Sequence, residues 1–238
     1  MTPMTLPLIA EATWEAVHPK KQLRVGMAVM QTDLRGSDTT QTRSYIPFIA
    51  EYDIFVFPEY CNTPEDFVPS VEECKRNIET LLVVSEHTLV VTHFNWRELG
   101  KWHNGCKVLY GGENIGEYLK VKTSSEEETA RYFRLSVASG DAPLVLQWEG
   151  VKIGIEICAD FGLLPINGHT DLDLSILVSC GNYYVNTPAL RDGGHHIIVD
   201  GYKANAGVWK KEGERAFPLP LTHNEQNPYI LLEQLSIK

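Results

Sequence analysis

Short apolar runs, each closed by a polar turn, recur along this chain and restrict it to folds built on β-sheets. Some runs are continuous, as in strands buried on both faces of a parallel sheet, and helical stretches separate them. Others come in pairs around a glycine-containing turn, which indicates β-hairpins. The mixture predicts an α/β protein with two mixed sheets covered by helices. The runs cover residues 23–31, 53–58, 88–93, 106–110, 117–122, 144–148, 151–157, 175–179 and 195–200.

The length and apolar content of the chain fit one domain. With 238 residues, 43% of them hydrophobic, the chain can bury a continuous core, and no low-complexity linker divides it. We expect a single domain over residues 1–238, with its core at about 23–207 and a C-terminal tail at 208–238. Within it, Ser70 and Glu73 have the spacing of a capping box, which predicts a helix from there to about Val84.

The overall charge excludes one class of partner. A formal net charge of -10 makes the average surface repel phosphate backbones, so we expect no nucleic acid partner. Residues 1–14 lack the basic and apolar regions of a signal peptide, and no apolar run approaches the ~20 residues that a spanning helix needs. These features predict a cytoplasmic protein without membrane contact.

The cysteines and histidines do not suggest a metal site. The chain has five scattered cysteines with no C-x-x-C pair, which is typical of reduced thiols in a cytosol. His195 and His196 are neighbours in a predicted strand, and adjacent strand residues point to opposite faces. They are therefore not expected to chelate one ion.

Three polar residues each follow a predicted buried strand. Glu59 comes directly after the run that ends in Phe-Pro, Lys120 lies near the end of a predicted hairpin, and Cys158 ends the run that begins at Val151. Ligands of open α/β sheets bind at the carboxyl ends of the strands. We therefore expect the three side chains to meet there.

These residue types together suit acyl chemistry on a thiol. At a strand-to-helix turn, backbone N–H groups, the helix dipole and a nearby ammonium favour the thiolate of Cys158. Glu59 can take the thiol proton, return it to a leaving amine and then activate water. Lys120, together with the N–H of Ala159, can stabilise the oxyanion of the tetrahedral intermediate.

The chain resembles the nitrilase superfamily, also called carbon–nitrogen hydrolases. The resemblance rests on four motifs in the order of that family: VGMAVMQ at 25–31, FPEY at 57–60, IGEYLK at 115–120 and KIGIEICAD at 152–160. It implies a four-layer αββα sandwich with a Glu-Lys-Cys triad, no cofactor, and pairing through helices into a homodimer or larger homo-oligomer. It also implies that Asp160 fixes the turn at the nucleophile.

Further features of the resemblance refine the expected activity. Many members carry a second glutamate after the lysine, and among Glu126, Glu127 and Glu128 we favour Glu128. Nitrile-hydrolysing members resemble Cys-Trp-Glu at the nucleophile, whereas this chain has Cys-Ala-Asp at 158–160, which favours amides. The segment between Cys180 and the strand at 195–200 is shorter than is usual in the family. That strand could be either the penultimate or the final one.

The resulting prediction is a cysteine-dependent hydrolase of a small-molecule amide, carbamoyl or terminal amide group, acting through a thioester on Cys158. Other interpretations remain open at this stage. Cys180 is a rival nucleophile, Lys122 a rival for the lysine, and Glu59 could be a simple cap. The same thioester also permits acyl transfer to an acceptor other than water. The shortened segment before His195 leaves open a catalytically silent binding protein.

Overall fold

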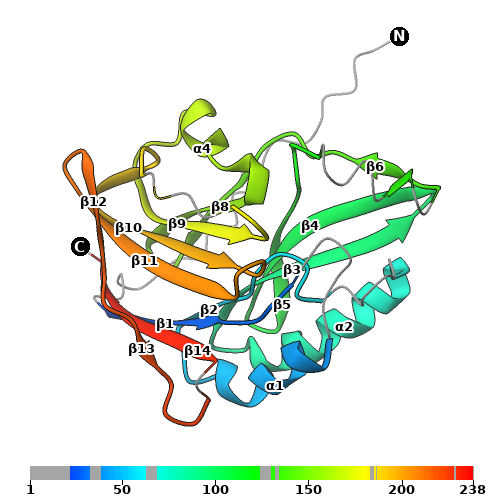
Figure 1. The fold of residues 1–238 in the computed structure, drawn as a ribbon, viewed down its shortest axis with the longest axis horizontal. Helices are drawn as coiled ribbons and strands as arrows, with labels where there is room; N and C mark the ends of the chain where they lie inside the picture. Colours follow the sequence, from blue (N-terminus) through cyan, green and yellow to red (C-terminus); the bar gives the residue numbers. More distant parts are fainter. Residues whose placement is uncertain are drawn as a thin grey trace.

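Two β-sheets packed face to face form the centre of the molecule (Figure 1). This computed structural model describes residues 22–32, 39–62, 69–123, 130–131, 134–182, 185, 187–227 and 229–237. Both sheets are mixed, which confirms the predicted sandwich of two mixed sheets. The two faces that meet are lined by aliphatic side chains, and their burial holds the sheets together.

The first sheet has the strand order β13-β14-β1-β2-β3-β4-β5, with β6 paired to β4. Neighbours β1, β2 and β3 run parallel, because a helical segment connects each to the next. Strands β3, β4 and β5 are joined by hairpins and run antiparallel, whereas β6 runs parallel to β4. Its strands are β1 (Gln22–Ala28), β2 (Ile54–Val56), β3 (Leu89–Glu98), β4 (Lys101–Tyr110), β5 (Glu113–Leu119), β6 (Ser136–Ala138), β13 (Thr222–His223) and β14 (Ile230–Ser236).

The second sheet has the order β12-β11-β10-β9-β8-β7. Its central strands β8, β9 and β10 are parallel, and their carboxyl ends lie at the same edge of the sheet. Along these strands alternate residues, such as Ile155, Ile176 and Ile197, face the first sheet and are fully buried. Its strands are β7 (Leu144–Trp148), β8 (Val151–Ile157), β9 (Leu172–Ser179), β10 (Leu190–Asp200), β11 (Asn205–Glu212) and β12 (Arg215–Pro218).

The helices are distributed unequally over the two outer faces. Helices α1 (Thr39–Ile49) and α2 (Val71–Val84) pack side by side on the first sheet (Figure 1). The predicted capping box is confirmed, since Ser70 and Glu73 bond each other's backbone N–H. Among the described residues, the second sheet has only α4 (Leu163–Ile166) on its outer side. None of the helices described is long and apolar enough to cross a bilayer.

The predicted boundary of the core at residue 207 is wrong. Residues 205–236 supply four strands, and β14 pairs with β1 over seven residue pairs from Gln22–Ser236 to Ala28–Ile230. The segment predicted to be a tail therefore completes both sheets, and Leu235 is fully buried in the core between them. Strand β10, which contains residues 195–200, is consequently neither the penultimate nor the final strand.

Candidate active site

The three predicted site residues lie together where strands of the two sheets end. Glu59 follows β2, Lys120 follows β5, and Cys158 follows β8. The Lys120 ammonium is 2.8 Å from Oε1 of Glu59, and both side chains are almost completely buried. The charges of both residues act on the Cys158 thiol. A carboxylate, an ammonium and a thiol therefore share one buried region between the sheets.

The two carboxylate oxygens of Glu59 differ in their surroundings. Oε1 accepts hydrogen bonds from Lys120 Nζ, at 2.8 Å, and from Asn104 Nδ2, at 3.2 Å. Oε2 is buried and has no hydrogen-bond partner among the described residues. A buried carboxylate oxygen is normally paired, because leaving it unpaired costs its full desolvation penalty. Such an exception indicates an oxygen that is kept available for a proton or a ligand.

Asn104 is itself held by a histidine that the sequence did not single out. The backbone N–H of Tyr60 donates to Nδ1 of His93 at 3.0 Å, so the proton of the neutral ring lies on Nε2. Nε2 is 2.5 Å from Oδ1 of Asn104, which turns the amide N–H₂ toward Glu59. This chain of contacts, from the backbone next to Glu59 back to its carboxylate, fixes the orientation of the carboxylate.

The backbone of Glu59 is tied to both sheets. Its carbonyl accepts a 2.6 Å hydrogen bond from the Thr32 hydroxyl, and its N–H donates to the carbonyl of Ser179 at the end of β9. Thr32 N–H in turn donates to Gly201 O, just beyond β10. A Cβ at Gly201 would lie 1.8 Å from Thr32 Oγ1, so only glycine permits this approach. These contacts hold Glu59 and the turn after β9 in one rigid unit.

The backbone at Cys158 has the strained geometry of a sharp turn. Its φ of 45° lies in the left-handed region, which non-glycine residues rarely adopt, and it starts the 3-10 turn η1 (Cys158–Asp160). The carboxylate of Asp160 accepts hydrogen bonds from the N–H groups of Val121, at 2.9 Å, and Lys122, at 2.7 Å. Asp160 thus joins the turn that carries the thiol to the segment that follows Lys120.

The direction predicted for the ionisation of Cys158 is wrong. Burial, and next the charge of Glu59, raise the pKa of the thiol, while Lys120 opposes this rise. The turn at Cys158 is a three-residue 3-10 turn instead of a helix with a substantial dipole, and the Lys120 ammonium already pairs with Glu59. The resting thiol is therefore protonated at neutral pH, and a base has to remove its proton.

The remaining predicted residues fall into three groups. Lys122 has an exposed side chain and Ala159 is half-buried in η1, so Lys120 is the lysine that meets Glu59. Cys180 lies beside the site, where its sulfur donates to Thr32 O at 3.4 Å. Glu128, with its two acidic neighbours, lies outside the described residues. The described part of the chain has no cluster of three or more His, Cys, Asp or Glu side chains that could hold a metal ion.

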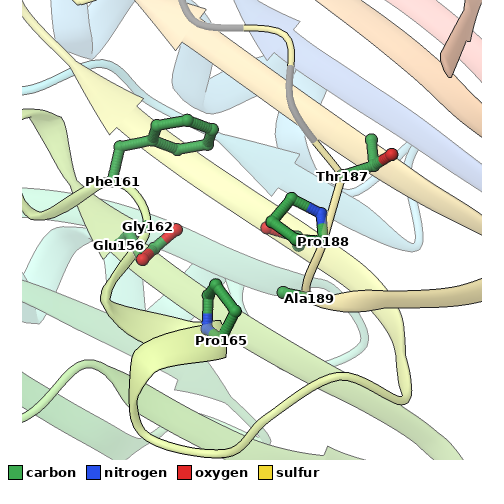
Figure 2. Close-up of a pocket in the computed structure, with 8 residues that line it drawn as sticks. Glu156, Phe161, Gly162, Pro165, Thr187, Pro188 and Ala189 are labelled. Carbon is green, nitrogen blue, oxygen red and sulfur yellow. The ribbon is translucent and has the colours of Figure 1, made fainter. Parts of the chain in front are cut away.

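A small cavity lies behind the nucleophile, on the outer face of the second sheet. Its volume of about 20 Å³ has room for roughly one water molecule. Figure 2 shows Glu156 directed from β8 toward the segment of Phe161 and Pro165, with Thr187 opposite. Glu156 is buried and accepts a 2.9 Å hydrogen bond from Leu164 N–H, which anchors the segment after Cys158.

Glu156 should make the stability of the fold pH-dependent. Burial raises its pKa to about 7, against 4.5 for the unfolded chain. Because the folded pKa is the higher one, its contribution is full below pH 4.5 and is lost as pH rises through 7. We expect the free energy of unfolding to fall by about 2–3 kcal/mol over this window, and Glu156→Gln to remove this loss. Urea unfolding at pH 5 and 8 measures it, with exposed Glu79→Gln as control; equal pH dependence in both variants would contradict the assignment.

Structure comparison identifies the fold. The chain superimposes on Nit3 of Saccharomyces cerevisiae, a member of branch 10 of the nitrilase superfamily, with a TM-score of 0.64 at 14% identity, covering 92% of this chain and 91% of Nit3. An amidase from Nesterenkonia sp. gives a TM-score of 0.60 at 14% identity, with 94% and 93% covered. The fold is that of the nitrilase superfamily. No protein-family model and no curated protein sequence matches the chain.

The nitrilase fold also occurs as part of a larger protein. Glutamine-dependent NAD+ synthetase from Acinetobacter baumannii gives a TM-score of 0.63 at 16% identity and covers 90% of this chain. This chain spans about half of that synthetase, 47% of its length. At these identities the comparisons establish the fold, and the chemistry has to be argued from the site.

Proposed function

We propose that this protein hydrolyses the carbon–nitrogen bond of a small amide, carbamoyl or terminal amide group through a thioester on Cys158. The observation that carries the proposal is the asymmetry of Glu59. Lys120 and Asn104 both bind Oε1, so Oε2, buried and without a hydrogen-bond partner in the described part of the chain, is a base beside a thiol that needs one. A solvated cap or a structural ion pair would not require this arrangement.

The acylation step uses Glu59 twice. Oε2 takes the proton of the Cys158 thiol while the sulfur attacks the carbonyl carbon, and the carbonyl electrons move onto its oxygen. The Lys120 ammonium, buried beside Glu59, would stabilise that oxyanion. As the intermediate collapses, Glu59 returns the proton to the leaving nitrogen. The amine departs and the acyl group remains on sulfur as a thioester.

Deacylation repeats the sequence with water as the nucleophile. Glu59 takes a proton from water, the resulting hydroxide attacks the thioester carbonyl, and collapse expels the sulfur, which recovers its proton from Glu59. The fold supports this proposal indirectly. In one variant of the Nesterenkonia amidase, the acetamide moiety of fluoroacetamide is covalently attached to the active-site cysteine.

Trapping the acyl-enzyme tests the proposal. The intact protein should release ammonia from members of a panel of small primary amides and should gain the mass of the acyl group on the peptide that contains Cys158. Because the thioester forms before water attacks, rapid acid quenching should reveal it within the first turnover. Added hydroxylamine should capture the thioester as the hydroxamate, and formation of the free acid in reactions without an added amine separates hydrolysis from acyl transfer. Acylation of Cys180 in place of Cys158 would overturn the assignment.

A further inference from the structure

The turn that follows β9 is built to hold one side chain in place. The backbone N–H of Asn182 donates to the Ser179 hydroxyl at 2.9 Å, and the N–H of Gly181 donates to the buried carboxylate of Asp200 at 2.6 Å. Gly181 has a φ of 104°, a conformation that glycine adopts without strain. A charged acceptor and a side-chain turn therefore fix the backbone that presents Asn182.

The side chain that this turn presents reaches the sulfur of the nucleophile. Nδ2 of Asn182 is 3.2 Å from Sγ of Cys158, and Sγ is 3.7 Å from the carbonyl oxygen of Cys180. The thiol proton can point to that carbonyl, whereas the amide N–H can only donate toward the sulfur. Among the described residues, this is the sole hydrogen bond of the Asn182 side chain. Within the described part of the chain, the sulfur is thus the partner to which the turn presents this amide.

We propose that Asn182 is a catalytic residue that donates a hydrogen bond to the Cys158 sulfur and stabilises the thiolate while Glu59 holds the proton. This inference rests on the proposed function, since it assigns a role within the same site. It goes beyond the Glu-Lys-Cys set by adding a neutral group that contacts the reacting atom.

The site needs such a group for an electrostatic reason. Burial and the charge of Glu59 both act against a negative sulfur. The Lys120 ammonium, which is shared with Glu59, and hydrogen bonds with the Cys180 backbone and the Ser179 side chain lower the pKa of the thiol without offsetting that rise. A second cation would strengthen the pairing of the carboxylate and weaken it as a base. A fixed amide N–H stabilises the thiolate without changing the charge on Glu59. Asn182 therefore assists the nucleophile while leaving Oε2 available.

Alkylation of Cys158 measures this role without any substrate. In Asn182→Ala, loss of the donor should raise the pKa of the thiol by about one unit, so iodoacetamide should react with Cys158 about tenfold more slowly at pH 8. Asn182→Asp should slow it further, because a carboxylate then faces the sulfur. Peptide mass spectrometry follows Cys158 and Cys180 separately over pH 6–10 in the full-length protein. Gln147→Glu makes the same amide-to-carboxylate change on the exposed face of β7. In this variant Cys158 should be alkylated at the same rate as in the unaltered protein.

The direction of the change separates catalysis from structure. A merely structural Asn182 would, when replaced, loosen the turn and expose the buried thiol, which would speed alkylation of Cys158 and Cys180 together. An unchanged rate, within twofold, or a faster one would overturn the role of Asn182. Slower alkylation would support it even if every amide tested is inert, and then only the proposed hydrolysis would fail. If amides acylate Cys158 but the Asn182 variants show an unaltered alkylation rate, the proposed role of Asn182 fails and the proposed hydrolysis stands.

Discussion

Cys158→Ala is expected to abolish amide turnover while leaving the fold unchanged. Removing the nucleophile of a covalent mechanism lowers kcat by on the order of 10⁴-fold or more, because the remaining groups cannot form the thioester. Cys158 is buried at the edge of the inter-sheet core, but the change removes only one sulfur atom. We expect the midpoint of urea unfolding to stay close to that of the unaltered protein. Ammonia release from the amide panel and the acyl-enzyme mass together measure the loss.

The rival nucleophile supplies the matched control. Cys180 sits on the neighbouring strand end, and its sulfur donates to a backbone carbonyl, so Cys180→Ala should keep most of the turnover. Retained hydrolysis in a folded Cys158→Ala protein together with its loss in Cys180→Ala would assign the chemistry to Cys180. If both variants keep their activity, the protein does not use a thiol for the reaction.

The parts of the site at strand ends were predictable from sequence. A buried strand is a continuous apolar run, so the first polar residue after it, as with Glu59 and Cys158, is placed at the sheet edge by local pattern alone. Lys120 follows a hairpin run in the same way. The meeting of the three residues was not set by local pattern, because Glu59 and Lys120 belong to the first sheet and Cys158 to the second, so it depends on how the two sheets pack.

The groups that orient these residues were not predictable in that way. His93 and Asn104 lie within strands β3 and β4, and their contact depends on the register that pairs His93 with Cys106 and Asn95 with Asn104. The available signal was a polar residue inside an otherwise apolar run, but this pattern does not indicate which residue the side chain contacts. Asn182 belongs to a turn whose shape is set by Asp200, eighteen residues later. The direction in which the pKa of the thiol is shifted likewise depends on burial and on Glu59.

The C-terminal strand shows the same limit at the level of the fold. Residues 230–236 contain an apolar run, but pairing with β1 joins positions about 200 residues apart, such as Leu23 and Leu235. Local periodicity carries no information on such a pairing, which is why the segment was interpreted as a tail. The predicted homo-oligomer depends in the same way on a partner surface and stays a prediction.

Lys120→Met is expected to destabilise the fold by about 3–5 kcal/mol. It leaves the completely buried carboxylate of Glu59 with the hydrogen bond from Asn104 but without a cation, and an uncompensated buried charge is costly. Urea unfolding at pH 7 measures the change. Lys152→Met is the matched control, because its ammonium pairs with Asp171 on the surface, where the side chains are 33% and 67% exposed. An exposed pair contributes about 0–1 kcal/mol, so the control should be close to the unaltered protein.

The double variant Lys120→Met/Glu59→Gln decides whether the cost arises from the unpaired charge. Glutamine keeps an oxygen that can accept from Asn104, and a neutral pair of similar volume needs no counter-charge, so most of the lost stability should return. A double variant as unstable as Lys120→Met would show that lost packing is responsible and that the ion pair is not the cause. Recovery of stability without recovery of turnover would show that the fold tolerates neutral residues here. The buried charges would then be retained for the chemistry at Cys158, at a cost to the fold that hydrophobic residues would avoid.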